Sequence, residues 1–197
     1  MPKSRVNDVL ALASAQDGYI TTREVANAGI TRRALAGMVE RGWLERVARG
    51  VYRVVNRGEH HEADLLSPYR EVVMWAQSHR GPRVALSHET ALAILGITDA
   101  NPTRIHLTVP QRARLRRVPL PHVILHRGTL DDQDIIDYKG LPLTSVRRTI
   151  LDLVRSGSIC FAQDALNEAR KEGFVSKIEF TKLRREMMDT KSASRKN

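Results

Sequence analysis

Apolar residues at helical spacing predict an amphipathic helix directly after Gly29. One side of this helix carries an apolar stripe, formed by Ile30, Ala34, Leu35, Met38 and Val39. The opposite side carries small and charged residues, namely Arg33, Ala36, Gly37 and Glu40, with Arg32 at its margin. Small residues let a helix approach another surface closely, and an arginine pair near its start can meet base edges. The pattern is typical of a recognition helix that binds DNA.

The stretch from Trp43 to Val54 predicts two short strands around a turn. Its basic residues include Arg46 and Arg49, so the hairpin has positive charge near its tip. A basic hairpin directly after a recognition helix is the wing of a winged helix-turn-helix. The alternative is an ordinary amphipathic helix and hairpin whose arginines are only solvated.

Two further helices are predicted before the recognition helix. An apolar pattern that Asp17-Gly18 closes predicts the first of them. Thr21 and Glu24 have the spacing of a capping box, which predicts the start of a short helix from Thr22 to Asn27. The order helix, helix, turn, helix, wing predicts a winged helix-turn-helix that binds double-stranded DNA, over residues 1–56.

The chain after the wing predicts a second domain over residues 62–188, joined by a polar linker at 56–61. Short apolar runs predict a small mixed sheet, with strands at 84–86, 105–109, 122–126 and 135–138. Helical patterns predict five helices, at 67–79, 87–95, 144–154, 161–169 and 176–188. The predicted fold class is α+β, with an N-terminal winged helix-turn-helix followed by a mixed α/β domain that ends in helices.

A formal net charge of +10 favours a polyanionic partner such as DNA. The stretch from Asn101 to Gly128 holds six arginines and no acidic residue. We therefore expect a second electrostatic contact with DNA from the middle of this stretch, through Arg112, Arg114, Arg116 and Arg117. Residues 189–197 are polar and basic, and they are expected to form a disordered tail.

The candidate DNA-binding residues of the first domain lie on the predicted helix and wing. They are Thr31, Arg32, Arg33, Ala36, Gly37, Arg41, Arg46 and Arg49. Arg33 is expected to contact bases in the major groove, with Arg32 close by. Arg46 and Arg49 are expected on the phosphate backbone or in the minor groove.

The composition, with 42% hydrophobic and 27% charged residues, is that of a soluble globular protein. No apolar run approaches the length of a membrane span, and Arg5 and Asp8 follow Met1 without a signal peptide, so we expect a cytoplasmic protein. A single cysteine, Cys160, excludes an internal disulfide and a thiolate zinc cluster. Its apolar neighbours predict a buried thiol.

No glycine-rich phosphate loop, HExxH helix or GxSxG elbow is present, and we expect no enzyme activity. One acidic pattern, Asp131, Asp132, Asp134 and Asp137-Tyr138-Lys139, resembles the metal-binding pattern of many nucleases. A metal-dependent DNA nuclease is therefore an alternative function. A solvated turn before a strand explains the same aspartates without catalysis.

Histidines on the predicted strands raise the question of a metal site. His122 and His126 lie on one face of their strand, and His106 alternates with apolar neighbours. Three such histidines could bind a metal, but satisfied or exposed histidines are far commoner. The pair His60-His61 is not accompanied by a carboxylate or cysteine cluster at ligand spacing. We therefore expect neither a metal nor any other cofactor.

Three further stretches follow the winged helix in a fixed order: Ser87-His88-Glu89-Thr90-Ala91-Leu92-Ala93-Ile94-Leu95-Gly96, Ile105-His106-Leu107-Thr108-Val109-Pro110, and Leu141 through Leu153. In this order and spacing, the chain from about Val6 to Leu153 resembles the AbiEi family of antitoxins. The resemblance implies a bacterial antitoxin and transcriptional autorepressor whose winged helix binds promoter DNA. It also implies a C-terminal domain that counteracts a nucleotidyltransferase-like toxin encoded beside it.

The resemblance assigns no residue that neutralises the toxin, because the segment from Ser156 onward matches the family only in being helical. Candidate toxin contacts are the exposed flanks of the C-terminal helices, such as Arg147, Arg148, Arg170 and Lys171. A plain winged-helix regulator without a toxin partner is the remaining alternative.

Overall fold

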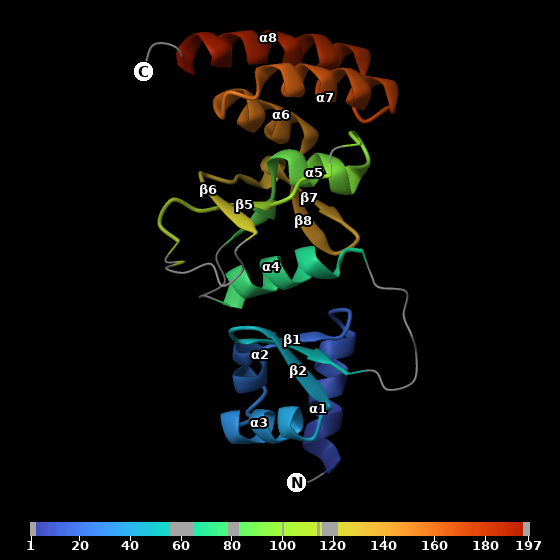
Figure 1. The fold of residues 1–197 in the computed structure, drawn as a ribbon, viewed down its shortest axis with the longest axis vertical. Coiled ribbons are helices and arrows are strands. Elements are labelled where there is room, and N and C mark those ends of the chain that lie inside the picture. The colour runs from blue at the N-terminus through green and yellow to red at the C-terminus, as the bar shows by residue number, and fades with distance from the viewer. Residues whose placement is uncertain are drawn as a thin grey trace. The chain divides into compact units, whose positions relative to one another are not determined.

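The computed structural model divides into two compact units (Figure 1). One comprises Met1–Pro82 with Arg114–Leu120, and the other comprises Arg83–Ala113 with Pro121–Asn197. The structure describes residues 3–55, 65–78, 83–99, 101–113, 115 and 122–194. The linker expected at 56–61 lies outside the described residues.

The first unit has the predicted order of helices and wing. Its first three helices are α1 (Lys3–Ser14), α2 (Thr22–Asn27) and α3 (Arg32–Glu40). Its strands β1 (Tyr19–Thr21), β2 (Leu44–Ala48) and β3 (Val51–Val54) form an antiparallel sheet in the order β1-β3-β2. Strand β1 was not predicted. Its three residues are too few to show an alternating pattern, and they become a strand through pairing with β3.

Local signals start the helices of this unit as the sequence predicts. The Thr21 hydroxyl accepts a hydrogen bond from the Glu24 N–H at 3.3 Å, and the Glu24 carboxylate accepts one from the Thr21 N–H at 2.8 Å. Gly29 adopts the left-handed conformation that the turn before α3 requires, with φ of 71°. The apolar sides of the three helices and β2 share one core, formed by Val9, Ala13, Ile20, Val25, Ile30, Ala34, Leu35, Met38 and Leu44.

A fourth helix, α4 (Ser67–Ser78), also packs in the first unit, against β2 and β3. It buries Val72, Val73, Trp75 and Ala76. Near it, the Tyr19 hydroxyl donates to the Glu71 carboxylate at 3.4 Å. The domain boundary predicted from the sequence, at residue 62, places this helix in the second domain instead. Helical periodicity identifies the buried side of a helix but not the surface that covers it.

The second unit contains a mixed five-stranded sheet in the order β6-β5-β4-β8-β7. The strands are β4 (Ala85–Leu86), β5 (Ile105–Val109), β6 (Val123–Arg127), β7 (Ile135–Tyr138) and β8 (Leu141–Thr144). The pairs β5–β6 and β4–β8 are parallel, and the other two pairs are antiparallel. This confirms the small mixed sheet.

Strand β8 was not predicted, because Pro142 argues against a strand at the sequence level. The flanking side chains of Leu141 and Leu143 are buried, and β8 pairs with β7 as a hairpin. The turn residues Lys139 and Gly140 both have positive φ, at 52° and 76°. Two such residues in succession match the right-handed twist of a two-residue hairpin.

Helices stack in layers above this sheet (Figure 1). Helix α5 (His88–Leu95) contacts β5 and β8, and α6 (Val146–Arg155) packs on α5. Helices α7 (Ile159–Lys171) and α8 (Lys177–Ser194) pack on α6 and on each other. A short 3-10 turn, η1 (Asp132–Asp134), precedes β7.

The C-terminal end of α8 corrects the expected disordered tail. The helix continues through Ser194, so the expectation is wrong for residues 189–194. Met187 is buried, and the Thr190 hydroxyl donates to the Glu186 carbonyl at 2.8 Å, so side-chain contacts still support the last turns. Residues 195–197 lie outside the described residues.

The exposure of Cys160 is a second correction, because a buried thiol was expected. Helix α7 buries the side formed by Ala162, Ala165, Leu166 and Ala169. Cys160 lies on another side of this helix. Apolar sequence neighbours do not bury a helical residue, since adjacent residues point in directions about 100° apart.

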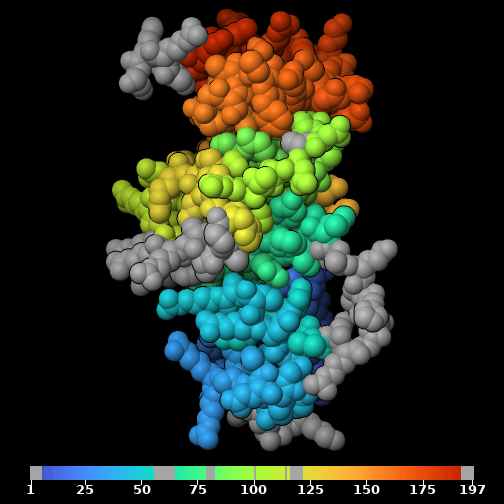
Figure 2. Space-filling model, in the orientation of Figure 1, coloured from blue at the N-terminus to red at the C-terminus, as the bar shows by residue number. Residues whose placement is uncertain are grey.

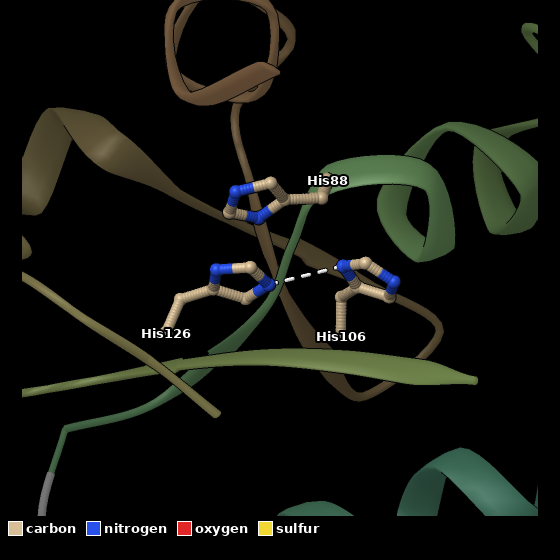
Figure 3. Close-up of side chains that lie close together, drawn as sticks. All are labelled: His88, His106 and His126. Carbon is tan, nitrogen blue, oxygen red and sulfur yellow. Dashed lines mark hydrogen bonds between the residues drawn. The ribbon is translucent and has the colours of Figure 1, made fainter. Parts of the chain in front are cut away.

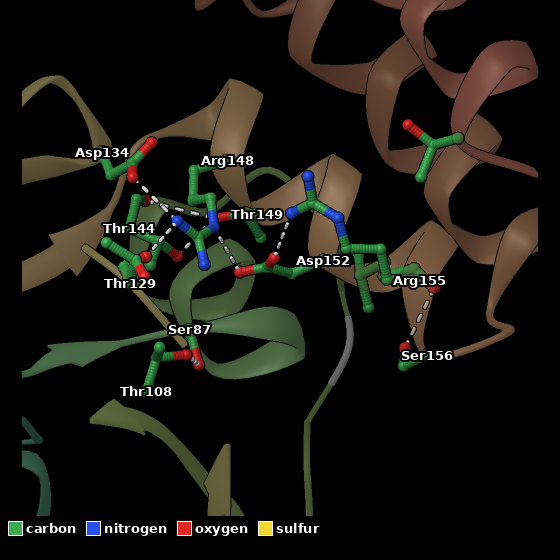
Figure 4. Close-up of polar contacts among 12 residues, drawn as sticks. Ser87, Thr108, Thr129, Asp134, Thr144, Arg148, Thr149, Asp152, Arg155 and Ser156 are labelled. Carbon is green, nitrogen blue, oxygen red and sulfur yellow. Dashed lines mark hydrogen bonds and ion pairs between the residues drawn. The ribbon is translucent and has the colours of Figure 1, made fainter. Parts of the chain in front are cut away.

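One largely buried arginine, Arg148, joins three parts of the second unit (Figure 4). The Arg148 guanidinium donates to the carboxylates of Asp134 at 2.7 Å and Asp152 at 2.8 Å, and to the Thr129 carbonyl at 2.6 Å. Burial opposes its charge, but the hydrogen bonds and charges of Asp152 and Asp134 outweigh this and raise the pKa of Arg148. Arg148 is therefore an internal residue and not the exposed toxin contact that the sequence suggested.

Replacing Arg148 by Ala should destabilise the second unit by about 3 kcal/mol, because two poorly solvated carboxylates lose their shared partner. Arg147→Ala is the matched control. Its side chain is 52% exposed and pairs with Glu186, so its loss should cost less than about 1 kcal/mol.

Urea unfolding followed by circular dichroism and tryptophan fluorescence tests this prediction. Both tryptophans, Trp43 and Trp75, belong to the first unit, so their fluorescence should change little in Arg148→Ala. Equal stability losses in the two variants would contradict the role assigned to Arg148.

Candidate nucleic-acid interface

The start of α3 forms a positively charged end on the surface of the first unit. The Thr31 hydroxyl caps the helix by accepting a hydrogen bond from the Ala34 N–H at 3.2 Å. Arg32 and Arg33 follow and are exposed, and the first turn contains no acidic residue. The helix dipole adds a partial positive charge at this end. Two cations and the helix N-terminus therefore face solvent together, an arrangement that attracts anions.

The outward side of α3 carries Ala36, which is exposed, and Gly37, which is half-buried. A Cβ atom on Gly37 would lie 3.2 Å from Nη2 of Arg41, so the Arg41 side chain crosses this glycine. The Arg41 guanidinium also lies over the Trp43 ring, 4.8 Å from its centroid. The absence of a side chain at position 37 thus leaves room for an arginine that an aromatic ring orients.

Trp43 was missed among the predicted DNA-binding residues. Its contact with Arg41 makes it a positioning residue of the surface, and its side chain is 38% exposed. The available sequence signal was a tryptophan two residues after an arginine in a basic segment. Large aromatic residues at solvent-facing positions often orient arginines in this way.

The wing is formed by β2 and β3, and its turn contains Arg49 and Gly50. Gly50 has φ of 82° and its carbonyl accepts hydrogen bonds from the Thr22 N–H at 2.8 Å and the Thr22 hydroxyl at 3.1 Å. A Cβ atom on Gly50 would lie 3.0 Å from the Thr22 hydroxyl oxygen. These contacts hold the tip of the wing against the start of α2.

The arginines of the wing fall into two groups. Arg53 pairs with Glu45 across the two strands, so its charge is balanced within the sheet. Arg46 and Arg49 are exposed. Among the residues that the structure describes, no carboxylate forms an ion pair with Arg46, Arg49, Arg32 or Arg33. Their charges are available to a partner.

Helix α3 packs beside β2, and both present side chains at the surface of the unit (Figure 2). The structure therefore brings the predicted residues of the helix and the wing onto adjoining elements. Thr31, Arg32, Arg33, Ala36, Gly37 and Arg41 come from α3 and its ends, and Arg46 and Arg49 come from the wing.

The second predicted group of arginines belongs to a segment that is described only in part. Arg112 is exposed on the turn after β5. The Arg127 guanidinium donates to the carbonyls of Gln111 at 3.2 Å and Ala113 at 2.9 Å, which holds this turn against the end of β6. Arg114, Arg116 and Arg117 lie outside the described residues.

The acidic pattern that suggested a nuclease is engaged in other contacts. Asp134 is buried and paired with Arg148. The Asp137 carboxylate accepts a hydrogen bond from the Gly140 N–H, and the Lys139 ammonium lies over the Tyr138 ring. Within the described part of the chain, these acidic residues do not form a group whose oxygens could hold one ion.

The histidines of the second unit combine differently from the sequence expectation. His106 and His126 lie close together, but the third member is His88 of α5 and not His122, which is exposed. Neighbouring strands bring His106 and His126 together, and only the tertiary structure adds a residue from a helix. No sequence spacing links His88 to either strand.

Comparisons with known proteins identify the family. A family model described as a transcriptional regulator, AbiEi antitoxin, matches residues 7–55, and one described as the AbiEi antitoxin C-terminal domain matches residues 84–196. No curated protein matches the chain. None of the helices described in the structure is long and apolar enough to span a membrane.

Among solved structures, the crystal structure of the RV2827C protein from Mycobacterium tuberculosis has a similar fold. The TM-score is 0.52 at 21% sequence identity, over 91% of this chain and 70% of that chain. This likeness supports the fold alone. With one model on the winged unit and another over more than half of the chain, the protein belongs to the AbiEi family of antitoxins.

Proposed function

We propose that this protein is the antitoxin and DNA-binding autorepressor of a bacterial toxin–antitoxin operon. Family membership supports an antitoxin that regulates transcription. One observation supports DNA binding in particular. The arginine-rich start of α3 adjoins the wing, and the exposed charges of both have no carboxylate partner among the described residues. The toxin class, nucleotidyltransferase-like, rests on the family resemblance. No catalytic activity is part of this proposal.

The surface formed by α3 and the wing is suited to binding duplex DNA. The N-terminal end of α3 enters the major groove, where Arg33 contacts a base edge and Arg32 lies beside it. Arg46 and Arg49 of the wing contact phosphates or the minor groove. Arg41, oriented by Trp43, contacts the backbone near the other end of the helix.

Arg33→Ala should weaken specific binding by about 1–3 kcal/mol and relax the sequence preference at one position, because a base contact is lost. Arg49→Ala should instead weaken binding to every duplex. It should also reduce the slope of log affinity against log salt by the amount expected for the loss of about one phosphate contact. Gel-shift titrations with the operator and a random duplex, at several salt concentrations, separate these effects.

Lys182→Ala is the control for both arginine variants, since Lys182 is exposed on α8 in the second unit. Its affinity should equal that of the unmodified chain. If both Arg33→Ala and Arg49→Ala also retain full affinity, the assignment of α3 and the wing is wrong.

We further propose that the arginine segment after β5 adds a second electrostatic contact. Arg112 is exposed, and six arginines without acidic residues lie between Asn101 and Gly128. Each phosphate that a cation neutralises releases counterions and steepens the dependence of affinity on salt.

Changing Arg112, Arg114, Arg116 and Arg117 together to Ala should reduce the salt slope and weaken specific and random binding alike. The measurement is the operator affinity of the full chain between low and physiological salt. Changing Arg155 and Arg170, which are exposed on other helices, gives a control of altered net charge. A salt slope identical to that of the unmodified chain would exclude the second contact.

The two activities are proposed to separate along the chain, with repression in the first unit and neutralisation in the second. The sequence suggested a boundary at residues 56–62, and the packing of α4 on β2 and β3 favours one at 82–83 instead. A fragment that begins at residue 62 would carry α4 without the strands that cover it. We therefore propose residues 83–197 as the neutralising unit.

A full chain with Arg32→Ala and Arg33→Ala should fail to repress its promoter and still protect cells from the toxin. A promoter reporter and a growth assay with the toxin co-expressed measure the two activities. Residues 83–197 alone, if folded by circular dichroism, should also restore growth. Loss of protection in the full-length double variant, or rescue by residues 1–82 alone, would refute the division.

A further inference from the structure

Three histidines meet at one end of the sheet in the second unit (Figure 3). His106 of β5 and His126 of β6 come from neighbouring parallel strands, and His88 comes from the first turn of α5. One ring nitrogen from each residue lies within 4.8 Å of the other two. Nδ1 of His106 and Nε2 of His126 are 3.0 Å apart.

Glu89 adds a carboxylate to this cluster. Its Oε2 atom lies 3.2 Å from Nδ1 of His106 and is buried without a hydrogen-bond partner. A buried carboxylate oxygen normally accepts hydrogen bonds or binds a cation. With bonds of about 2.0–2.1 Å, the ligands of a tetrahedral zinc ion lie roughly 3.3 Å apart. Two separations in the cluster are already close to that value.

The backbone of His88 is held in an unusual conformation that directs its ring into the cluster. Its φ of 53° is uncommon for a residue other than glycine. Ser87 fixes this corner, since its N–H donates to the His106 carbonyl at 2.9 Å and its hydroxyl accepts from Thr108 at 2.8 Å. The same hydroxyl lies 3.0 Å from Nδ1 of His88. Backbone strain of this kind is concentrated at functional sites.

Charges of both signs surround the cluster, since Arg148 acts to lower the pKa of His88 and Arg104 acts to lower the pKa of His106. Burial lowers the pKa of His88 to about 3, with further lowering by His126 and His106, and burial also lowers the pKa of His106 and His126. Glu89 and Asp152 supply nearby negative charge, since both act to raise the pKa of His126.

A hydrogen-bonded pair of histidines would explain only part of this arrangement. It accounts for the contact between His106 and His126. It leaves unexplained the strained backbone of His88 and the buried Oε2 atom of Glu89. A cation bound between the three rings would be coordinated by one nitrogen of each histidine, with the Glu89 carboxylate beside His106.

We propose that His88, His106 and His126 bind one divalent transition-metal ion of the zinc class, and that the Glu89 carboxylate, which lies 3.2 Å from Nδ1 of His106, moves to become the fourth ligand. Imidazole and carboxylate ligands favour Zn²⁺ and its neighbours over Mg²⁺ or Ca²⁺. The ion would join the start of α5 to β5 and β6. The rings of His88 and His126 stack with centroids 3.6 Å apart, so coordination requires one ring to rotate about its side-chain bonds.

The test uses a full-length parent in which His60, His61, His79 and His122 are replaced by Gln. Only the three clustered histidines then remain of the seven in the chain. After dialysis against a chelator, this parent should bind one Zn²⁺ per chain by titration calorimetry. Bound Co²⁺ should show the intense visible absorption of a tetrahedral ion, and Zn²⁺ should raise the unfolding temperature of the second unit by several degrees.

Two variants of this parent identify the ligands. His106→Gln with His126→Gln should abolish the Co²⁺ absorption and weaken Zn²⁺ binding at least a hundredfold. Glu89→Gln keeps the three imidazoles and the side-chain size, so it should fold normally and weaken Zn²⁺ binding at least tenfold. Circular dichroism verifies the fold of each variant.

The proposal is overturned if the parent binds no Zn²⁺, or if its Co²⁺ complex shows only the weak absorption of a six-coordinate ion. Zn²⁺ binding by the double histidine variant with the affinity of the parent would also overturn it. Unchanged affinity in a folded Glu89→Gln variant would remove the carboxylate from the proposed ligand set.

Discussion

The second unit depends on a largely buried guanidinium that two carboxylates share. The side chains of Arg148, Asp134 and Asp152 are only 14%, 9% and 8% exposed. Burial of one such charge alone would be costly, so Asp134 depends on Arg148, whereas Asp152 is paired with both Arg148 and Arg155. Because Asp134 precedes β7 and Arg148 lies on α6, their contact sets where the helical layer meets the sheet. The ion pair between Arg148 and Asp134 therefore fixes the position of α6 relative to the sheet, and it also stabilises the unit.

The same network borders the histidine cluster. The charge of Arg148 helps to lower the pKa of His88, and the charge of Asp152 acts in the opposite direction on His126. Helix α5 contributes a ring through a residue with a left-handed backbone, and β5 and β6 contribute the other two. A group of neutral imidazoles is therefore built from residues that the packing of a sheet, a helix and a salt-bridge network holds in place.

In the first unit, the charged groups are not part of the core. Its core is apolar, and the exposed charges of α3 and the wing lie outside that core, where water solvates them. The fold positions these charged side chains. The hydrogen bonds from Thr22 to Gly50 hold the wing, and the contact of Arg41 with Trp43 orients a cation beside Gly37. Charge, helix dipole and shape then favour the same partner, a polyanion.

Local signals determined much of this protein from sequence alone. The capping box at Thr21 and Glu24, the apolar stripe of α3 and the stop of α5 at Gly96 act over a few residues, so they were predictable. The hairpin of the wing and the basic surface were predictable for the same reason. The family was recognisable because three motifs keep their order.

The tertiary structure alone decided which distant residues meet. Strands β1 and β8 exist through pairing with β3, β4 and β7, and α4 joins the first unit because of the sheet that it covers. Neighbours on one helix can differ in exposure, as Arg147 at 52% and Arg148 at 14% show. His88 reaches two strand histidines for a similar reason. Periodicity specifies which side of an element is buried, whereas its partner is chosen by long-range packing that no local pattern encodes.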